Sequence, residues 1–178
     1  CSKSFFSSVA SDDFKGAVLA VEHLHGLGHR RIAHLAGDPA NLYARVRRDG
    51  FLAGLKSFGL PSGKSVLRVP DSNVEITGEF RRVMDDLLRK SGATAIFCGG
   101  DQTAMKALKV AVEAGVRVPE ELSIVGFADL DYTRWAVPAL TSVRQPFSEM
   151  GRLSAELLLS EIAKKTRFKA LRLPVELI

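Results

Sequence analysis

Four histidines lie close together in the sequence and could act as ligands of a metal ion. They are His23, His25, His29 and His34. His25 and His29 could share a helix face only if that helix continued through two glycines, and no set of cysteine or carboxylate ligands accompanies them. The spacing therefore predicts no metal site. We interpret the histidines as marking the end of a helix, where the helix dipole tolerates partly charged imidazoles.

The sequence contains no recognisable pattern for a catalytic nucleophile or for a cofactor-binding motif. Cys98 sits in an apolar run without a histidine partner by motif, and no serine lies in a GxSxG elbow. The glycines at positions 26, 28, 99 and 100 are too few for a dinucleotide fingerprint or a phosphate loop. We expect neither an enzyme nor a bound cofactor.

Arg47 carries the most specific chemical prediction. It falls on a predicted helix over residues 44–58, where Arg45 and Arg48 face solvent while Arg47 points toward a cleft. A guanidinium there can donate paired hydrogen bonds to vicinal hydroxyls or to a carboxylate. The alternative interpretation is an exposed helical arginine without a ligand.

The elements that must position these residues follow from the apolar pattern. Short β-rich runs alternate with longer amphipathic stretches, which predicts a parallel sheet with crossover helices. The predicted strands are residues 32–36, 66–69, 95–98, 122–127, 140–143 and 170–177. The predicted helices are residues 15–27, 44–58, 77–90, 101–114 and about 150–164. We therefore expect a doubly wound, three-layer α/β/α fold.

The polar residues that are candidates for a functional site are expected at one edge of the predicted sheet. Ligands of doubly wound sheets bind beyond the carboxyl ends of the strands, so segments 37–47, 99–101 and 127–135 should share that edge. Asp101 follows a strand and is well placed to cap the next helix. Asp129 also follows a buried strand directly. Function should be sought at this edge.

The composition excludes several classes of protein. The 178 residues are 46% hydrophobic with a formal net charge of +5, but the basic residues are spread along the chain and form no nucleic-acid-binding motif. No run of about 18 apolar residues could span a membrane, and the first eight residues do not resemble a signal peptide. Two cysteines without CxxC spacing favour the cytoplasm.

Ordered segments along nearly the whole chain carry a specific resemblance. They are AVEHL at 20–24, LGHRRIA at 27–33, RRDGF at 47–51, LSIVGF at 122–127 and PALTSVRQP at 138–146. In this order they resemble the lactose-repressor/galactose-repressor family of bacterial transcription regulators. The resemblance implies a periplasmic-binding-protein type I fold, with this chain covering mainly the C-terminal subdomain of the effector-binding module.

The resemblance also implies a division of the chain. Residues 1–144 would form the C-terminal subdomain, with 1–14 as the entering crossover; residues 145–168 would be a crossover and a helix of the N-terminal subdomain; and residues 169–178 would be a returning strand. A DNA-binding headpiece would lie before residue 1. Such regulators bind a small effector, a sugar or related metabolite, between their subdomains and thereby change their affinity for operator DNA, usually as homodimers.

Matching positions imply an effector site. Arg47 corresponds to the arginine that clamps the effector, Asp101 to the acidic residue of an Asn-Asp pair, and Asp129 to the second acidic residue after a Gly-Phe pair. The remaining candidates, from the crossing between subdomains and from the rim, are Gln145, Phe147 and Tyr43.

Three positions depart from the family pattern. Gly100 stands where the asparagine of that pair is usual, Ala128 where the first, effector-binding aspartate is usual, and Val74 where an aromatic ring often stacks on a sugar. A buried hydroxyl without its partner costs about 1 to 3 kcal/mol, so an ordinary hexose should bind poorly. The effector is then less polar, or phosphorylated and anchored on Arg47, or effector sensing has been lost.

Two other functions share the predicted fold. A periplasmic sugar-binding protein also closes two lobes around its ligand, but segments 27–32 and 138–146 favour the regulator. A small α/β enzyme has only the fold in its favour, and a fold does not imply a function.

Overall fold

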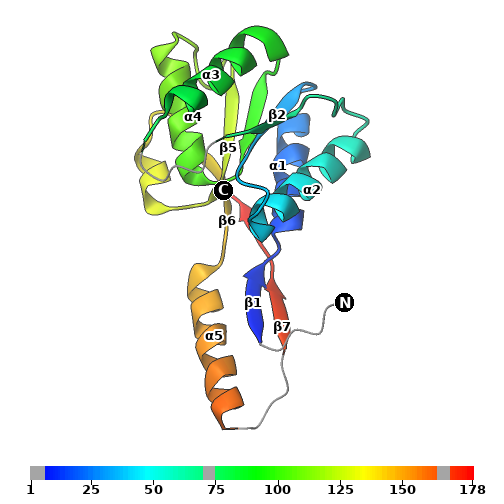
Figure 1. The fold of residues 1–178 in the computed structure, drawn as a ribbon, viewed down its shortest axis with the longest axis vertical. Helices are drawn as coiled ribbons and strands as arrows, with labels where there is room; N and C mark the ends of the chain where they lie inside the picture. Colours follow the sequence, from blue (N-terminus) through cyan, green and yellow to red (C-terminus); the bar gives the residue numbers. More distant parts are fainter. Residues whose placement is uncertain (1–6, 70–74, 164–168) are drawn as a thin grey trace.

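A central sheet between two layers of helices forms the upper part of the molecule (Figure 1). The computed structural model describes residues 7–69, 75–163 and 169–178, and within them six strands pair in the order β3-β2-β4-β5-β6-β8. All neighbours are parallel except β6 and β8. The strands are β2 (Ile32–Ala36), β3 (Val66–Arg68), β4 (Ala95–Cys98), β5 (Ser123–Ala128), β6 (Thr141–Arg144) and β8 (Glu176–Leu177). The predicted three-layer fold is confirmed.

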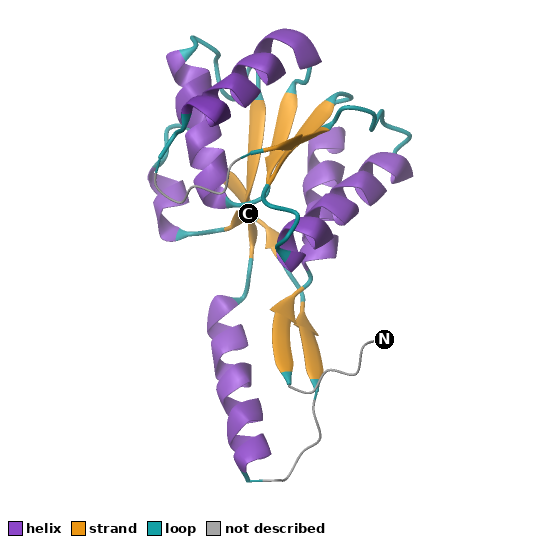
Figure 2. Ribbon diagram, viewed as in Figure 1, coloured by secondary structure: helices purple, strands orange, loops and turns teal. Residues whose placement is uncertain are grey.

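Helices cover both faces of this sheet (Figure 2). One layer holds α1 (Asp13–Gly26) and α2 (Leu42–Ser57). The other holds α4 (Asp101–Glu113) and α3 (Gly78–Asp86), which continues as a π-helical turn over Leu87–Ser91. Two side-chain caps fix helix starts, because Asp12 accepts from the backbone N–H of Lys15 and Thr77 accepts from that of Phe80.

Alternation along the strands divides the core into two halves. In β4, Ile96 and Cys98 pack toward α3 and α4, whereas Ala95 and Phe97 pack toward α1 and α2. All four residues are fully buried. A sheet buried on both faces explains why the predicted strands read as nearly continuous apolar runs.

A smaller unit lies beyond the carboxyl end of β6. There β1 (Ser8–Ser11) pairs in parallel with β7 (Ala170–Leu173), and α5 (Phe147–Ile162) runs beside them (Figure 1). No residue of α5 is buried. No described helix is long and apolar enough to cross a membrane.

The prediction of one strand over residues 170–177 was wrong. The segment forms β7 in the small sheet and β8 in the large sheet. Pro174 lies between the two strands and lacks the N–H that a continuous ladder would need.

Candidate functional site

A cavity of about 210 Å³ opens at the carboxyl edge of the large sheet, the edge at which β6 leads into α5. Its walls come from β2 and β5, from residues that follow β2, β4 and β5, and from the first two turns of α2. The lining includes His34, Tyr43, Arg47, Gly99, Gly100, Asp101, Phe127 and Ala128. Predicted residues from three segments, 37–47, 99–101 and 127–135, therefore meet at one site.

Arg47 lies at the centre of this site and is buried, with 8% of its surface exposed. Its guanidinium is 3.0 Å from the carboxylate of Asp13 and donates to the carbonyl of Gly99 at 2.5 Å. It also stacks over the ring of Phe127, 3.7 Å from the centroid. Burial lowers the pKa of Arg47, and the carboxylate of Asp13 opposes that shift. An arginine carries five N–H donors, of which Nε and Nη2 contact Asp13 and Nη1 donates to Gly99, so two have no partner among the described residues.

A chain of hydrogen bonds links Arg47 to the crossing between the two units. Ser11 donates to Asp13 Oδ1 at 2.5 Å, and the side-chain amide of Gln145 donates to Ser11 Oγ at 2.6 Å. Ser11 ends β1, and Gln145 follows β6 just before α5 begins. Gln145 therefore reaches the site through Asp13 rather than by lining the cavity.

His34 was not predicted as a site residue and forms part of the cavity wall. It lies on β2 with 1% of its surface exposed. Its Nδ1 is 2.9 Å from the carbonyl oxygen of Phe97, and its ring stacks on that of Phe97 at a centroid distance of 4.8 Å. The sequence feature that marks His34 is a polar residue inside a strand whose other members are apolar. The four histidines were interpreted only as possible metal ligands or as residues at the end of a helix.

Asp101 does not cap its helix, contrary to the prediction. It is the first residue of α4, and Gly100 occupies the capping position without a side-chain hydrogen bond. The buried carboxylate of Asp101 accepts instead from Ser142 Oγ at 2.6 Å and from the backbone N–H of Leu130 at 2.8 Å. A side chain at Gly126 would clash with this carboxylate. Asp101 thus ties α4 to β6 and to the loop after β5.

The backbone turns sharply at the end of β5, at the cavity edge. Ala128 and Asp129 have φ angles of 135° and 57°, a region that residues other than glycine rarely adopt. The side chain of Asp129, 5% exposed, pairs with Arg144 at 2.6 Å and does not line the cavity. Ala128 does line it, at the position where the resemblance leads one to expect an aspartate.

The other predicted residues divide between the site and its surroundings. Tyr43 and Gly100 line the cavity, and the Tyr43 ring lies 5.3 Å from the guanidinium carbon of Arg47. Phe147, the first residue of α5, is 49% exposed and lies outside the lining. Val74 lies outside the described residues.

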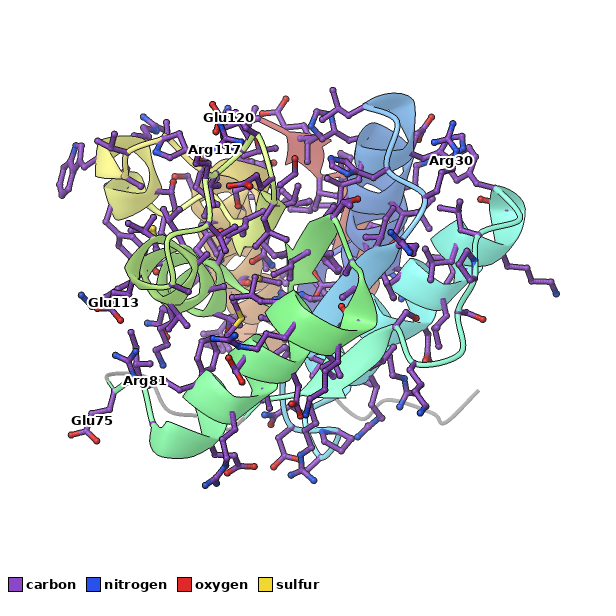
Figure 3. All side chains as sticks on the ribbon, turned by 90° about the horizontal axis from the view of Figure 1, so that it is seen from above. Arg30, Glu75, Arg81, Glu113, Arg117 and Glu120 are labelled. Carbon is purple, nitrogen blue, oxygen red and sulfur yellow. The ribbon has the colours of Figure 1, made fainter. Side chains whose placement is uncertain are left out.

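At the opposite end of the molecule, Arg30 and Arg117 lie well apart from each other (Figure 3). Arg30 donates to the backbone carbonyls of His25 and His29, and Arg117 pairs with Glu121 at 3.1 Å. His29 bonds Thr94 and Ser123, and burial lowers its pKa. Among the described residues, no group of three or more histidine, cysteine, aspartate or glutamate side chains is placed to hold a metal ion.

The chain matches both a protein-family model and curated transcriptional repressors. A family model described as a periplasmic binding protein-like domain matches residues 21–178. The HTH-type transcriptional repressor PurR of Yersinia pestis bv. Antiqua is 34% identical over 161 residues, which are 90% of this chain and 47% of that protein. The chain thus spans about half the length of the curated relatives that it matches.

Solved structures that resemble this chain are also transcriptional regulators. The transcriptional regulator CelR in complex with cellobiose has a TM-score of 0.89 at 30% identity, covering 98% of this chain and 53% of that one. A dimeric Lac repressor has a TM-score of 0.88 at 29% identity, covering 100% of this chain and 64% of that one. These relatives are transcriptional regulators and not transport proteins or enzymes. The chain belongs to the periplasmic binding protein-like domain family and is homologous to the LacI-family transcriptional repressors.

Proposed function

We propose that this chain is the C-terminal part of the effector-binding module of a DNA-binding transcriptional regulator. The observation that carries the proposal is the cavity at the carboxyl edge of the sheet, which is lined by a buried arginine paired with Asp13. A small uncharged or phosphorylated metabolite would bind there, and the regulator would act on operator DNA in the cytoplasm. It would not be an enzyme, because its relatives are repressors.

The division of the chain is part of the proposal. Residues 1–144 would be the C-terminal subdomain, residues 145–168 a crossover and helix of the N-terminal subdomain, and residues 169–178 the returning strand. The exposed apolar residues of α5 support this division, because they would pack on an N-terminal subdomain that the homologous repressors are long enough to contain. These residues are Leu158, Leu159 and Ile162.

Effector binding would control DNA affinity by shifting the arrangement of the two subdomains. Arg47 belongs to one subdomain, and the Asp13–Ser11–Gln145 chain connects it to the crossing. A ligand that engages Arg47 in only one arrangement would favour that arrangement, since differential affinity is the physical requirement. A homodimer would bring two DNA-binding headpieces together, as the dimeric Lac repressor suggests. Sedimentation of the full-length protein as a monomer would contradict the dimer.

The test is ligand binding by the full-length regulator. Calorimetry with cellobiose, D-ribose and D-ribose 5-phosphate should find binding by at least one of them. Arg47→Lys should then weaken that binding by about tenfold or more, since a lysine keeps the charge but loses the fork of donors. Arg48→Lys is the matched control, because Arg48 is the next residue of α2 and its side chain is 38% exposed. Equal affinities in all three proteins would contradict the site.

A further inference from the structure

The imidazole of His34 lines the cavity and carries an unused hydrogen-bond acceptor. Nδ1 faces the carbonyl oxygen of Phe97 at 2.9 Å, and a carbonyl can only accept, so Nδ1 carries the proton. In the neutral ring, Nε2 is then a bare acceptor. Among the described residues Nε2 has no hydrogen-bond partner, and the ring lines the cavity.

The environment keeps this imidazole neutral and fixed in position. Burial lowers the pKa of His34 to about 4, and the charges of Arg47 and Arg48 on α2 add to the shift. The ring packs against those of Phe51 and Phe97, at centroid distances of 5.1 Å and 4.8 Å. Because this acceptor is already fixed in position, ligand binding loses little side-chain entropy at His34.

The charges around the cavity disfavour an anion. The positive charge of Arg47 is matched by Asp13 at 3.0 Å, which leaves the carboxylate of Asp101 as the unmatched charge among the lining residues. The amino end of α4 adds a partial positive charge, but Asp101 lies in that first turn and offsets it. A phosphate would therefore meet a buried carboxylate without a free cation to balance it.

We propose that the cavity takes an uncharged effector that donates an O–H or N–H hydrogen bond to Nε2 of His34. His34 would thus determine specificity, by rejecting analogues that lack the donor. This inference rests on the proposed function and names the chemical class of its effector.

The first experiment compares uncharged ligands with their phosphorylated counterparts. Thermal unfolding of the full-length regulator is measured with D-ribose and D-ribose 5-phosphate, and with adenosine and adenosine monophosphate. The expected result is stabilisation by an uncharged member, with its phosphorylated counterpart binding at least about tenfold more weakly. Stabilisation by the phosphorylated members alone overturns this inference and leaves the proposed function standing. If no member stabilises the regulator and cellobiose also fails to bind in calorimetry, both the inference and the proposed function are overturned.

The second experiment separates the ligand contact of His34 from its structural role. In His34→Asn, the side-chain amide can still donate to the carbonyl of Phe97, but the acceptor in the cavity is lost. In His34→Gln, a carbonyl oxygen can reach the position of Nε2, while the bond to Phe97 is lost. The asparagine variant should bind the stabilising uncharged ligand about tenfold more weakly, and the glutamine variant within about threefold of the wild type.

The controls decide between a contact and a folding defect. His25→Asn alters an imidazole that stacks on Phe58 outside the cavity, and it should leave affinity unchanged. Melting temperatures without ligand report the structural cost of each variant. If both His34 variants lose affinity in proportion to their loss of melting temperature, His34 acts only structurally and the inference is overturned.

Discussion

Two neighbouring arginines on α2 form ion pairs in very different surroundings. The side chains of the Arg47–Asp13 pair are 9% and 12% exposed, whereas those of Arg48–Asp49 are 38% and 54% exposed. Removing one partner of a buried pair leaves an uncompensated charge, whereas an exposed pair is largely solvated in any case. Their contributions to stability should therefore differ although the residue types are the same.

We predict that Asp13→Ala lowers the free energy of unfolding by about 3 kcal/mol and that Asp49→Ala changes it by less than about 1 kcal/mol. Urea denaturation of the two variants measures the difference. Equal costs would mean that the Gly99 carbonyl and the Phe127 ring are sufficient partners for the buried guanidinium of Arg47.

His34 should make stability depend on pH. Its pKa falls from an ordinary value of 6.5 to about 4 in the folded protein, because burial penalises the charged ring. The unfolded chain then binds more protons than the folded protein between these values, so the contribution is complete above about pH 6.5 and is lost as the pH falls. Compared with His34→Phe, the wild type should lose about 2 kcal/mol more stability between about pH 7.5 and about pH 5. Parallel pH profiles in urea denaturation would contradict the buried neutral imidazole.

The sequence was informative about single residues only where a periodic pattern positioned them. The helical period predicted that Arg47 turns inward while its neighbour Arg48 faces solvent, which agrees with their exposures. The partners of Asp101 come from β6 and from the loop after β5, and no local pattern could reveal them. Asp13, which lies 34 positions before Arg47, was missed for the same reason.

At the scale of elements, close packing of α1 against α2 holds the cavity wall in place. A side chain added at Gly50 on α2 would clash with the backbone carbonyl of Phe14 on α1 and would lie 3.0 Å from Cβ of Ala17. The contact involves backbone, which cannot move aside as a flexible side chain can. Glycine at this position therefore serves helix packing rather than a turn.

Gly50→Ala should lower the free energy of unfolding by roughly 1 to 3 kcal/mol, although alanine is the better helix former. Gly26→Ala is the matched change, because Gly26 ends α1 and has no atom within 4 Å of the added carbon. That variant should be neutral or up to about 1 kcal/mol more stable. Denaturation of both variants checks the packing, and a neutral Gly50→Ala would show that the helices can separate without cost.

Elements were predictable where the apolar pattern was strong. The strands at residues 32–36 and 95–98 are found with the predicted bounds, because both are central and buried on two faces. The segment 170–177 failed because its two halves pair in different sheets, with β1 and with β6. The identity of a distant pairing partner is a tertiary property that local alternation does not encode.

At the scale of the whole molecule, the chain passes between a large unit covered by helices on both faces and a small unit covered on one side only. The large sheet has two helical layers and a divided core, whereas the small sheet has α5 on one side (Figure 1). Most of the stability of a helix in a protein comes from tertiary packing of its apolar face. The small unit should therefore be stable only when the N-terminal subdomain of the proposed regulator covers it.

Hydrogen exchange can test this dependence directly. In the 178-residue chain alone, amides of α5 should exchange at nearly unprotected rates, because none of its residues is buried. Amides of β4 should stay protected, since that strand is buried on both faces and paired on both sides. In the proposed full-length regulator, α5 should gain protection of about a hundredfold or more as Leu158, Leu159 and Ile162 become covered, while β4 changes little. Equal protection of α5 in both proteins would mean that this helix is stable without the N-terminal subdomain, and the proposed division of the chain would have to be redrawn.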